Sequence, residues 1–166
     1  MAVRPVLRIP DPVLAAVAAP VGRVDDGARA LAVDLIDTMR GSPACVGIAA
    51  PQIGVGLRAF AMDVTGHRKA RSCHGELVLF DPEVLVARDT VVGREGCMSV
   101  PDLTGDVARA TRLTVVGTGV DGERTTFEVD AFEARAVLHE IDHLDGLVFL
   151  DRAPGSHAVF PRKVYR

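Results

Sequence analysis

The sequence predicts an α+β fold in which mostly antiparallel strands pack around a central helix, with a further helix near the N-terminus. Three observations support this prediction: a helical pattern early in the chain, a long region of short strand-like pieces, and a second helical pattern near the end. We find no internal repeat, no low-complexity tract and no convincing linker. The 166 residues are therefore expected to form one domain spanning residues 1–166.

The first helix is predicted over residues 26 to 40. Its N-terminal end is marked by Asp25 and Asp26, which are favoured at a helix start, and its C-terminal end by Gly41. Between them, apolar residues recur at helical spacing, namely Ala28, Leu31, Ala32, Leu35 and Met39. One side of this helix is thus expected to face a core.

From about residue 45 to 129, short apolar pieces alternate with Gly, Pro and Asp, which is typical of strands joined by turns. We expect strands within 57 to 64, 76 to 85 and 89 to 100. The segment 112 to 130 predicts a hairpin, because the Asp121-Gly122 pair suits a turn with positive φ.

The second helix is predicted over residues 131 to 144. Asp130 is expected to cap its start, and Glu133, three residues on, completes a pattern like a capping box. Gly146 fits the left-handed position just past its end. The apolar side of this central helix consists of Phe132, Val137, Ile141 and Leu144.

Composition excludes several classes of function. The net charge is −3, with no Trp and one Tyr, so we expect no specific binding to nucleic acid. No apolar run approaches the roughly 20 residues that span a bilayer, and the N-terminus lacks the pattern of a signal peptide. The odd, scattered set of Cys45, Cys73 and Cys97 favours a reducing compartment. We therefore predict a cytoplasmic protein without membrane partners.

The stretch "HEIDH" at 139 to 143 carries the clearest chemical signal. On a helix, positions four apart lie on the same face, so His139 and His143 can bind one metal ion. Glu140 lies beside them and suits a general base that accepts a proton from a water molecule. The alternative is a polar, solvated helix face. With the metal hypothesis, the central helix becomes a metal-binding helix.

A third ligand must come from elsewhere in the chain. The downstream candidates, Asp145, Asp151 and His157, are close to the helix end or in a tail rich in Pro and Gly. Upstream, "EGCMS" at 95 to 99 offers Cys97, whose thiolate with two imidazoles suits Zn or Fe(II). The alternative for a lone cysteine is a small buried apolar residue.

The stretch "GIAAPQIG" at 47 to 54 does not have the pattern of an ordinary buried segment. Its glycines allow the backbone to approach a substrate closely, and the uncharged Gln52 amide can donate a hydrogen bond to an oxyanion. Taken alone, a Pro-Gln turn beside a strand explains the stretch as well.

Taken together, these stretches resemble the peptide deformylase family. They are "CVGIAAPQ" (45 to 52), "EGCMS" (95 to 99) and "HEIDH" (139 to 143), in the order that the family carries them. The N-terminal "VLRIPDPVL" and the later "HLDGLVFLDR" also fit, so the resemblance covers about residues 3 to 152. It implies a hydrolase that removes the N-formyl group from the formyl-methionine terminus of nascent polypeptides and releases formate.

The resemblance also implies roles for single residues. The metal ligands correspond to Cys97, His139 and His143, and the catalytic acid/base to Glu140. The oxyanion donors correspond to the Gln52 amide and the backbone N–H of Met98. The resemblance implies one divalent metal ion, Fe(II) in the cell, which Zn, Ni or Co can replace.

For the substrate, a formyl-methionyl nascent peptide, we expect two kinds of contact. The backbone of Val46, Gly47 and Ile48 is expected to pair with the extended peptide as an added strand. By resemblance, Val46, Phe132 and Arg135 surround the methionine pocket. A transient ribosome contact through the short basic tail "PRKVYR" (161 to 166) is a further partner to consider.

Three positions depart from the family pattern. Cys45 replaces a glycine, Leu138 replaces a glutamine, and Thr104 replaces an arginine, whereas Arg109 keeps the second arginine of that segment. An alternative function is therefore a weakly active or non-catalytic relative that binds metal or formyl peptide. Another alternative is a metallopeptidase, which would need a downstream metal ligand instead of the cysteine.

Overall fold

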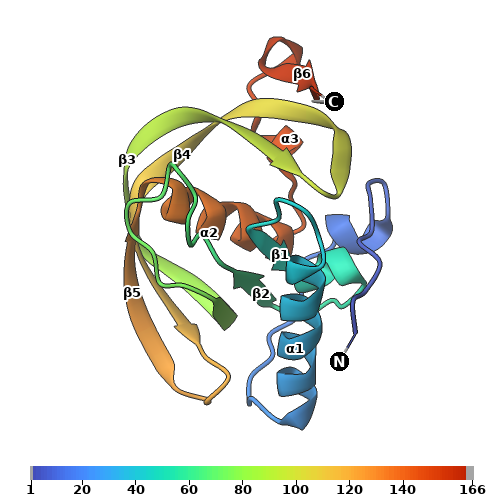
Figure 1. Ribbon diagram of the computed structural model, residues 1–166, viewed down its shortest axis with the longest axis vertical. Helices are drawn as coiled ribbons and strands as arrows, with labels where there is room; N and C mark the ends of the chain where they lie inside the picture. The colour runs from blue at the N-terminus through green and yellow to red at the C-terminus, as the bar shows by residue number, and fades with distance from the viewer. Residues whose placement is uncertain (1, 164–166) are drawn as a thin grey trace.

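The computed structural model describes residues 2–163, and its centre is a sheet that curves around one helix (Figure 1). The six described strands are β1 (Gly47–Ala49), β2 (Ala59–Met62), β3 (Leu77–Cys97), β4 (Val100–Thr118), β5 (Arg124–Asp130) and β6 (Val159–Pro161). The α-helices are α1 (Asp26–Arg40), α2 (Ala131–Leu144) and α3 (Phe149–Arg152), and short 3-10 turns lie at Pro12–Ala15, Ala50–Ile53 and Ser156–Ala158.

The neighbouring strands are antiparallel and follow the order β1-β2-β3-β4-β5, with β6 paired to β4. The long β3-β4 hairpin arches over α2, whereas β1 lies at one end of the strand order (Figure 1). The predicted fold class, α+β with antiparallel strands around a central helix, is confirmed.

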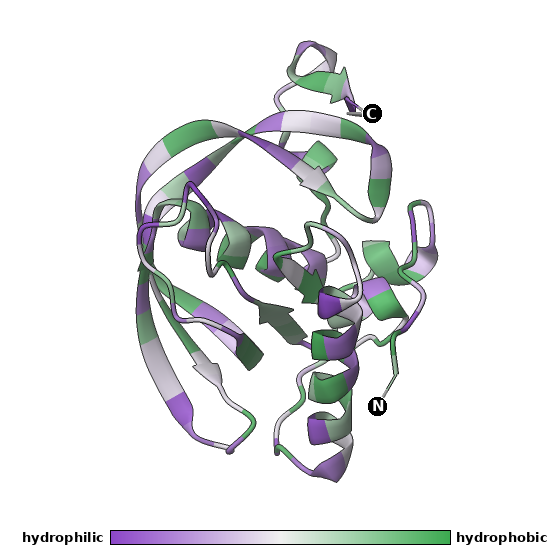
Figure 2. Cartoon of the chain, viewed as in Figure 1, coloured by the Kyte–Doolittle hydropathy of each residue, from purple (hydrophilic) through white to green (hydrophobic). Residues whose placement is uncertain are grey.

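Helix α1 has the bounds that the sequence predicts. Asp25 caps it, because its carboxylate accepts a hydrogen bond of 2.9 Å from the Ala28 N–H. Hydrophilic and hydrophobic stretches alternate along the helix (Figure 2). Its apolar residues, including Leu35, pack with Ala59 and Ala61 of β2. The neighbouring β2 residues Phe60 and Met62 pack in the other direction, in the cluster that contains α2. The two helices therefore cover opposite faces of β1 and β2.

The strand prediction for 76 to 100 is wrong in its divisions. The two expected pieces form one strand, β3, because Val86, Ala87 and Arg88 between them also pair with β4. Its pairing with β4 shifts register near Asp81 and Val84. Asp81 has a φ of 48°, and its carboxylate accepts the Val21 and Gly22 N–H groups at 2.8 Å each. These partners lie 60 and 59 residues away, so no local pattern signals them.

The β4-β5 hairpin is confirmed, with Gly122 at a φ of 83° in its turn. Helix α2 also has the predicted bounds, and Gly146 has the predicted left-handed conformation, with a φ of 78°. None of the helices within residues 2–163 combines the length and hydrophobicity that a bilayer crossing requires.

The predicted capping box of α2 is wrong. The Asp130 side chain makes no capping bond and instead accepts a hydrogen bond from the Ser72 N–H at 2.9 Å. Glu133 is 1% exposed and accepts bonds from the Ser72 hydroxyl and the His74 N–H. A buried carboxylate needs several donors, and the 72–74 loop supplies them. Both acids therefore hold this loop on the helix.

Candidate metal centre

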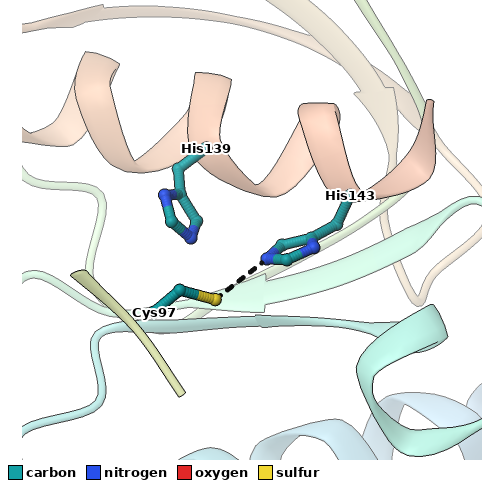
Figure 3. A group of neighbouring side chains, drawn as sticks. All are labelled: Cys97, His139 and His143. Atoms are coloured by element: carbon teal, nitrogen blue, oxygen red, sulfur yellow. Dashed lines mark hydrogen bonds between the residues drawn. The ribbon is translucent and has the colours of Figure 1, made fainter. Parts of the chain in front are cut away.

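Three side chains from two elements converge beneath the β3-β4 arch. His139 and His143 project from one face of α2 toward Cys97, the last residue of β3 (Figure 3). The Cys97 Sγ lies 3.3 Å from His143 Nε2, and the two imidazole centroids are 5.1 Å apart. The helical spacing predicted this convergence of the histidines, but the position of Cys97 depends on the tertiary fold.

The three ligand atoms fit a single metal ion. One atom each from Cys97, His139 and His143 lies within 4.8 Å of the others. Ligands around one tetrahedral ion are about 3.3–3.7 Å apart at ordinary Zn–N and Zn–S bond lengths. Burial lowers the pKa of His143 to about 3, so its imidazole is neutral, as metal binding requires. The buried His143 Nδ1 and Glu140 Oε2 have no hydrogen-bond partner among the described residues.

Glu95 orients the ring of His139 from the side opposite the other ligands. Its Nδ1 lies 2.8 Å from Glu95 Oε1, which leaves Nε2 to face the other ligands. Burial alone would lower the pKa of His139, but its interactions with Cys97 and Glu95 raise it well above the ordinary value. A metal ion would displace that proton, because a ligand imidazole must be neutral on its binding nitrogen.

Glu95 belongs to a buried ion network behind the ligands. Arg109 donates to Glu95 at 2.9 and 3.0 Å and to Asp142 at 2.5 Å, and Arg152 pairs with Asp142 from the outside. Burial opposes ionisation of Glu95, but hydrogen bonds from His139 and Arg109 outweigh it and lower its pKa to about 2. Arg109 therefore ties β3 to the metal-binding helix.

Glu140 lies against the edge strand β1. A Cβ atom on Gly47 would stand 2.8 Å from Glu140 Oε1, so only glycine leaves room for this carboxylate. Burial raises the pKa of Glu140 to about 7, and the charge of His139 opposes that rise. A buried carboxyl with a pKa near neutrality is suited to exchanging protons in both directions.

The Gln52 amide lies on the other side of the ligands. Its Oε1 accepts a 2.9 Å hydrogen bond from the Ala49 N–H. Its Nε2 donates to Ser99 Oγ at 3.1 Å and lies 3.5 Å from Cys97 Sγ. The Pro-Gln turn predicted as the alternative to a functional role exists, as the 3-10 turn Ala50–Ile53. The same turn also directs the Gln52 amide toward the candidate metal ligands.

A pocket of about 320 Å³ opens beside the ligands. Several predicted site residues line it, namely Val46, Gly47, Gln52, Cys97, Met98, Phe132, Arg135, His139 and Glu140. Met98 lies in the turn between β3 and β4, directly after Cys97. Ile48 does not line the pocket, because its side chain is fully buried in the cluster beside α1.

The guanidinium of Arg135 is largely used within the protein. It donates to Glu95 at 2.7 Å and to the carbonyls of Val107 and Val91 at 3.0 and 2.9 Å. Arg135 therefore binds the same carboxylate that holds His139, besides lining the pocket.

Sequence reasoning assigned no role to four residues at this site. Glu95 and Ser99 lie within the "EGCMS" stretch, so the motif itself was the signal that could have found them. His67 stacks on Phe132 with 3.7 Å between ring centroids, and Arg162 also lines the pocket. No local pattern marks these last two residues, because both reach the pocket through the tertiary fold.

The departures from the family pattern leave the ligands in place. Cys45 donates to the Gly47 carbonyl at 3.2 Å, and burial, together with Glu140, raises its pKa to about 12. Leu138 packs against the core on α2, and Thr104 pairs across from Gly96 in β4. A thiol that stays protonated in this way is a poor nucleophile.

Two of the downstream candidates for a metallopeptidase ligand, Asp145 and Asp151, are engaged elsewhere. Asp145 pairs with Arg58 at 2.9 Å, and Asp151 accepts the Val148 N–H at 2.8 Å. Within residues 2–163, the group of side chains that can hold a metal ion is Cys97, His139 and His143.

Comparison with known proteins finds the family that the sequence motifs resemble, and the match covers most of the chain. The family model of polypeptide deformylase matches residues 3–158. A peptide deformylase of Desulforudis audaxviator is 43% identical over 154 residues, covering 92% of this chain and 95% of the relative. One from Acidothermus cellulolyticus is 44% identical over 152 residues, covering 92% and 79%.

Solved structures agree with the sequence matches. The crystal structure of a peptide deformylase from Thermotoga maritima has a TM-score of 0.84 at 32% identity, covering 93% of this chain and all (100%) of that one. A class I type b peptide deformylase from Acinetobacter baumannii, crystallised with Met-Ala-Ser bound, also has a TM-score of 0.84 at 32% identity, with 92% and 100% coverage.

Proposed function

The chain belongs to the polypeptide deformylase family, and from this premise we propose which of its residues remove the formyl group from nascent peptides. The observation that carries the proposal is the convergence of three candidate ligands beside one pocket, which a buried carboxylate and an amide donor also line. We propose that residues 1–166 act as one catalytic domain; Met1 and residues 164–166 lie outside the described residues.

Cys97, His139 and His143 are the proposed metal ligands. When bound there, a divalent ion lowers the pKa of a water molecule and polarises the formyl oxygen. We propose Fe(II) as the ion in the cell, on the basis of the family, with Zn, Ni or Co as substitutes. The donor set of one sulfur and two nitrogens suits Fe(II) and Zn alike, so it does not choose between them.

Glu140 is the proposed proton carrier. As water attacks the formyl carbon, Glu140 accepts its proton, and the same carboxyl then delivers a proton to the departing methionine amine. The products are formate and a free N-terminus. A pKa of about 7 supports both transfers, because neither protonation state is strongly disfavoured near neutral pH.

Two donors stabilise the oxyanion that forms on the formyl oxygen. One is the Gln52 amide, whose Nε2 lies 3.5 Å from Cys97 Sγ and is fixed by the Ala49 and Ser99 contacts. The other is the Met98 N–H, which follows Cys97 in the β3-β4 turn. Losing one donor of this kind typically lowers turnover by ~10²–10³.

The substrate is proposed to lie along β1. We propose that the backbone of Val46, just before β1, and of Gly47 and Ile48 pairs with an extended peptide. The position of β1 at the end of the strand order supports this. Val46, Phe132 and Arg135 line the pocket, and we propose that it receives the methionine side chain. The structure with Met-Ala-Ser in a relative is consistent with a peptide ligand of this length.

We further propose a cytoplasmic location, because nascent chains carry the formyl group where they are synthesised. A transient ribosome contact through the basic tail stays a proposal. The last residues of that tail, 164–166, lie outside the described residues.

The experiment is formate release from formyl-Met-Ala-Ser by protein loaded with Fe(II) under anaerobic conditions. We expect release that depends on the metal and that Glu140→Ala and Glu140→Gln abolish, although both variants keep the metal and the fold. Release without metal, or unchanged turnover in both variants, would contradict the proposal.

A further inference from the structure

Arg162 brings a positive charge to the substrate pocket from a distant part of the sequence. It directly follows β6, which pairs with β4 through Leu103, Thr104 and Gly105. The Arg162 N–H donates to the Asp102 carbonyl at 2.9 Å, which extends this pairing by one residue. The side chain is therefore fixed at its base and lines the pocket.

The guanidinium lies beside the cysteine ligand. Its Nη2 donates to the Cys97 carbonyl at 3.3 Å. It also lies against Gly96, where an added Cβ would collide with Nη2. Thr104 faces Gly96 across the strand pair, and its short side chain leaves this space to Arg162. Two small neighbours thus make room for the guanidinium at this wall of the pocket.

The neighbouring segment holds β6 in place. Arg94 stacks on the ring of Phe160 at 3.9 Å and pairs with Asp106 at 2.6 Å. Phe160 itself pairs with Thr104 in the sheet. Arg162 is therefore presented by an anchored strand rather than by a free surface loop.

Arg162 differs from the other arginines of the pocket in its charge balance. Arg94 pairs with Asp106 and Arg135 with Glu95, both at hydrogen-bonding distance. No carboxylate within residues 2–163 pairs with Arg162, whose guanidinium has one hydrogen bond to a carbonyl. An arginine has five N–H donors, so this one offers both a net charge and free donors to a ligand.

We propose that Arg162 binds a carboxylate of the peptide substrate, just beyond the formyl-methionine, and so favours acidic peptides. The inference rests on the proposed function of the site. An extended peptide advances about 3.3 Å per residue, so a residue or two past the reacting group reaches an arginine that touches Cys97. The carboxylate is either an acidic side chain at the third residue or the terminal carboxylate of a short peptide.

The expected effect is on recognition rather than on chemistry. Arg162 is partly exposed, and pairs of this kind are worth a few-fold in affinity, so we expect a preference of roughly 3- to 5-fold in kcat/KM. The preference should weaken as salt is added, because exposed ion pairs are screened.

The test compares matched substrates that differ only in charge. One pair is formyl-Met-Ala-Asp-amide against formyl-Met-Ala-Asn-amide, which probes an acidic side chain. The other is formyl-Met-Ala-Ala with a free carboxylate against its amide, which probes the terminus. A preference in either pair identifies the source of the carboxylate. We expect Arg162→Gln to reduce the ratio within that pair to about one, because the ion pair is removed.

The control is Arg88→Gln, which removes the same charge from an exposed residue in the middle of β3. It should keep the wild-type ratio. Equal rates on charged and neutral peptides in the wild type, or the same preference in Arg162→Gln, would overturn the inference. Failure of the proposed function is distinguishable, because the wild type would then release no formate from the neutral amides.

Binding of product peptides gives a readout that needs no turnover. Calorimetry with Met-Ala-Asp-amide and Met-Ala-Asn-amide, and with Met-Ala-Ala and its amide, should show tighter binding of one charged peptide to wild type but not to Arg162→Gln. Equal affinities within both pairs for the wild type would also overturn the inference.

Discussion

At His139, one hydrogen bond determines which nitrogen faces the pocket. Glu95 holds Nδ1 at 2.8 Å, and Arg109 and Arg135 in turn hold Glu95. A ligand that is fixed in this way loses little conformational freedom when the metal binds. The affinity of the site should therefore depend on residues that never touch the metal.

Replacing Glu95 with Gln tests this dependence. We expect Glu95→Gln to weaken metal binding by ~10–100-fold, because the imidazole loses its charged partner. Competition against a chelator of known affinity would measure the change. Asp89→Asn is the matched control, since Asp89 pairs with Arg112 on the surface at 3.5 Å. Equal affinity in Glu95→Gln and wild type would contradict this account.

The residues of the candidate metal centre were predictable where their spacing is local. His139, Glu140 and His143 lie on one helix, and motif order pointed to Cys97. The Arg109 bridge between Glu95 and Asp142 was not predictable, because it joins residues 14 and 33 positions away. Such a bridge exists only once β3, β4 and α2 are packed.

At the scale of elements, the helices were predictable and the long strand was not. Asp25 and Gly41 bound α1, and Gly146 follows α2, all through short-range signals. Strand β3 continues between the two expected pieces because Val86, Ala87 and Arg88 pair with distant residues of β4. The capping box failed for a similar reason, since the 72–74 loop binds Glu133.

Gly146 makes a testable connection between α2 and the N-terminal segment. At its φ of 78°, an added Cβ would lie 2.8 Å from the Ala15 carbonyl. Gly122 has a similar φ of 83° but open space around it. Backbone strain of about 1–2 kcal/mol should apply to both Gly→Ala variants.

Only Gly146→Ala should carry a further cost of about 1–3 kcal/mol from the collision. Urea unfolding of the two variants would measure the difference. Equal destabilisation of Gly122→Ala and Gly146→Ala would show that the N-terminal segment yields freely, against our expectation.

At the scale of the whole molecule, the buried ion network couples the fold to pH. The pKa of Glu95 is about 2 in the folded protein, against 4.5 ordinarily. As the pH falls, the unfolded chain therefore takes up this proton first, and folding stability is lost between these two values. The contribution of Glu95 at neutral pH is roughly 3 kcal/mol.

Acid unfolding of metal-free protein would test this coupling. We expect the wild type to be more stable than Glu95→Gln at neutral pH, and this advantage to shrink between the pH values of 4.5 and 2. Urea unfolding of both proteins at several pH values would measure the difference in their free energies of unfolding. An advantage that stays constant across this range would show that Glu95 does not hold its charge as described.

Arg162 shows what sequence reasoning misses at this scale. It lies 65 positions from Cys97, in a tail for which the sequence suggested only a ribosome contact. The pairing of β6 with β4 brings it to the pocket. The fold class and the proposed metal ligands followed from motifs, but the charge of the pocket follows from the assembled sheet.

The most direct test of the central claim is a titration of metal-free protein with Fe(II) under anaerobic conditions. Formate release from formyl-Met-Ala-Ser is followed at each step, with Cys97→Ser and His143→Ala alongside. We predict that release rises linearly and stops rising at one ion per chain, and that both variants need far more metal or stay inactive. Release from the metal-free protein, or an unchanged end point in both variants, would contradict the claim that Cys97, His139 and His143 hold the catalytic metal.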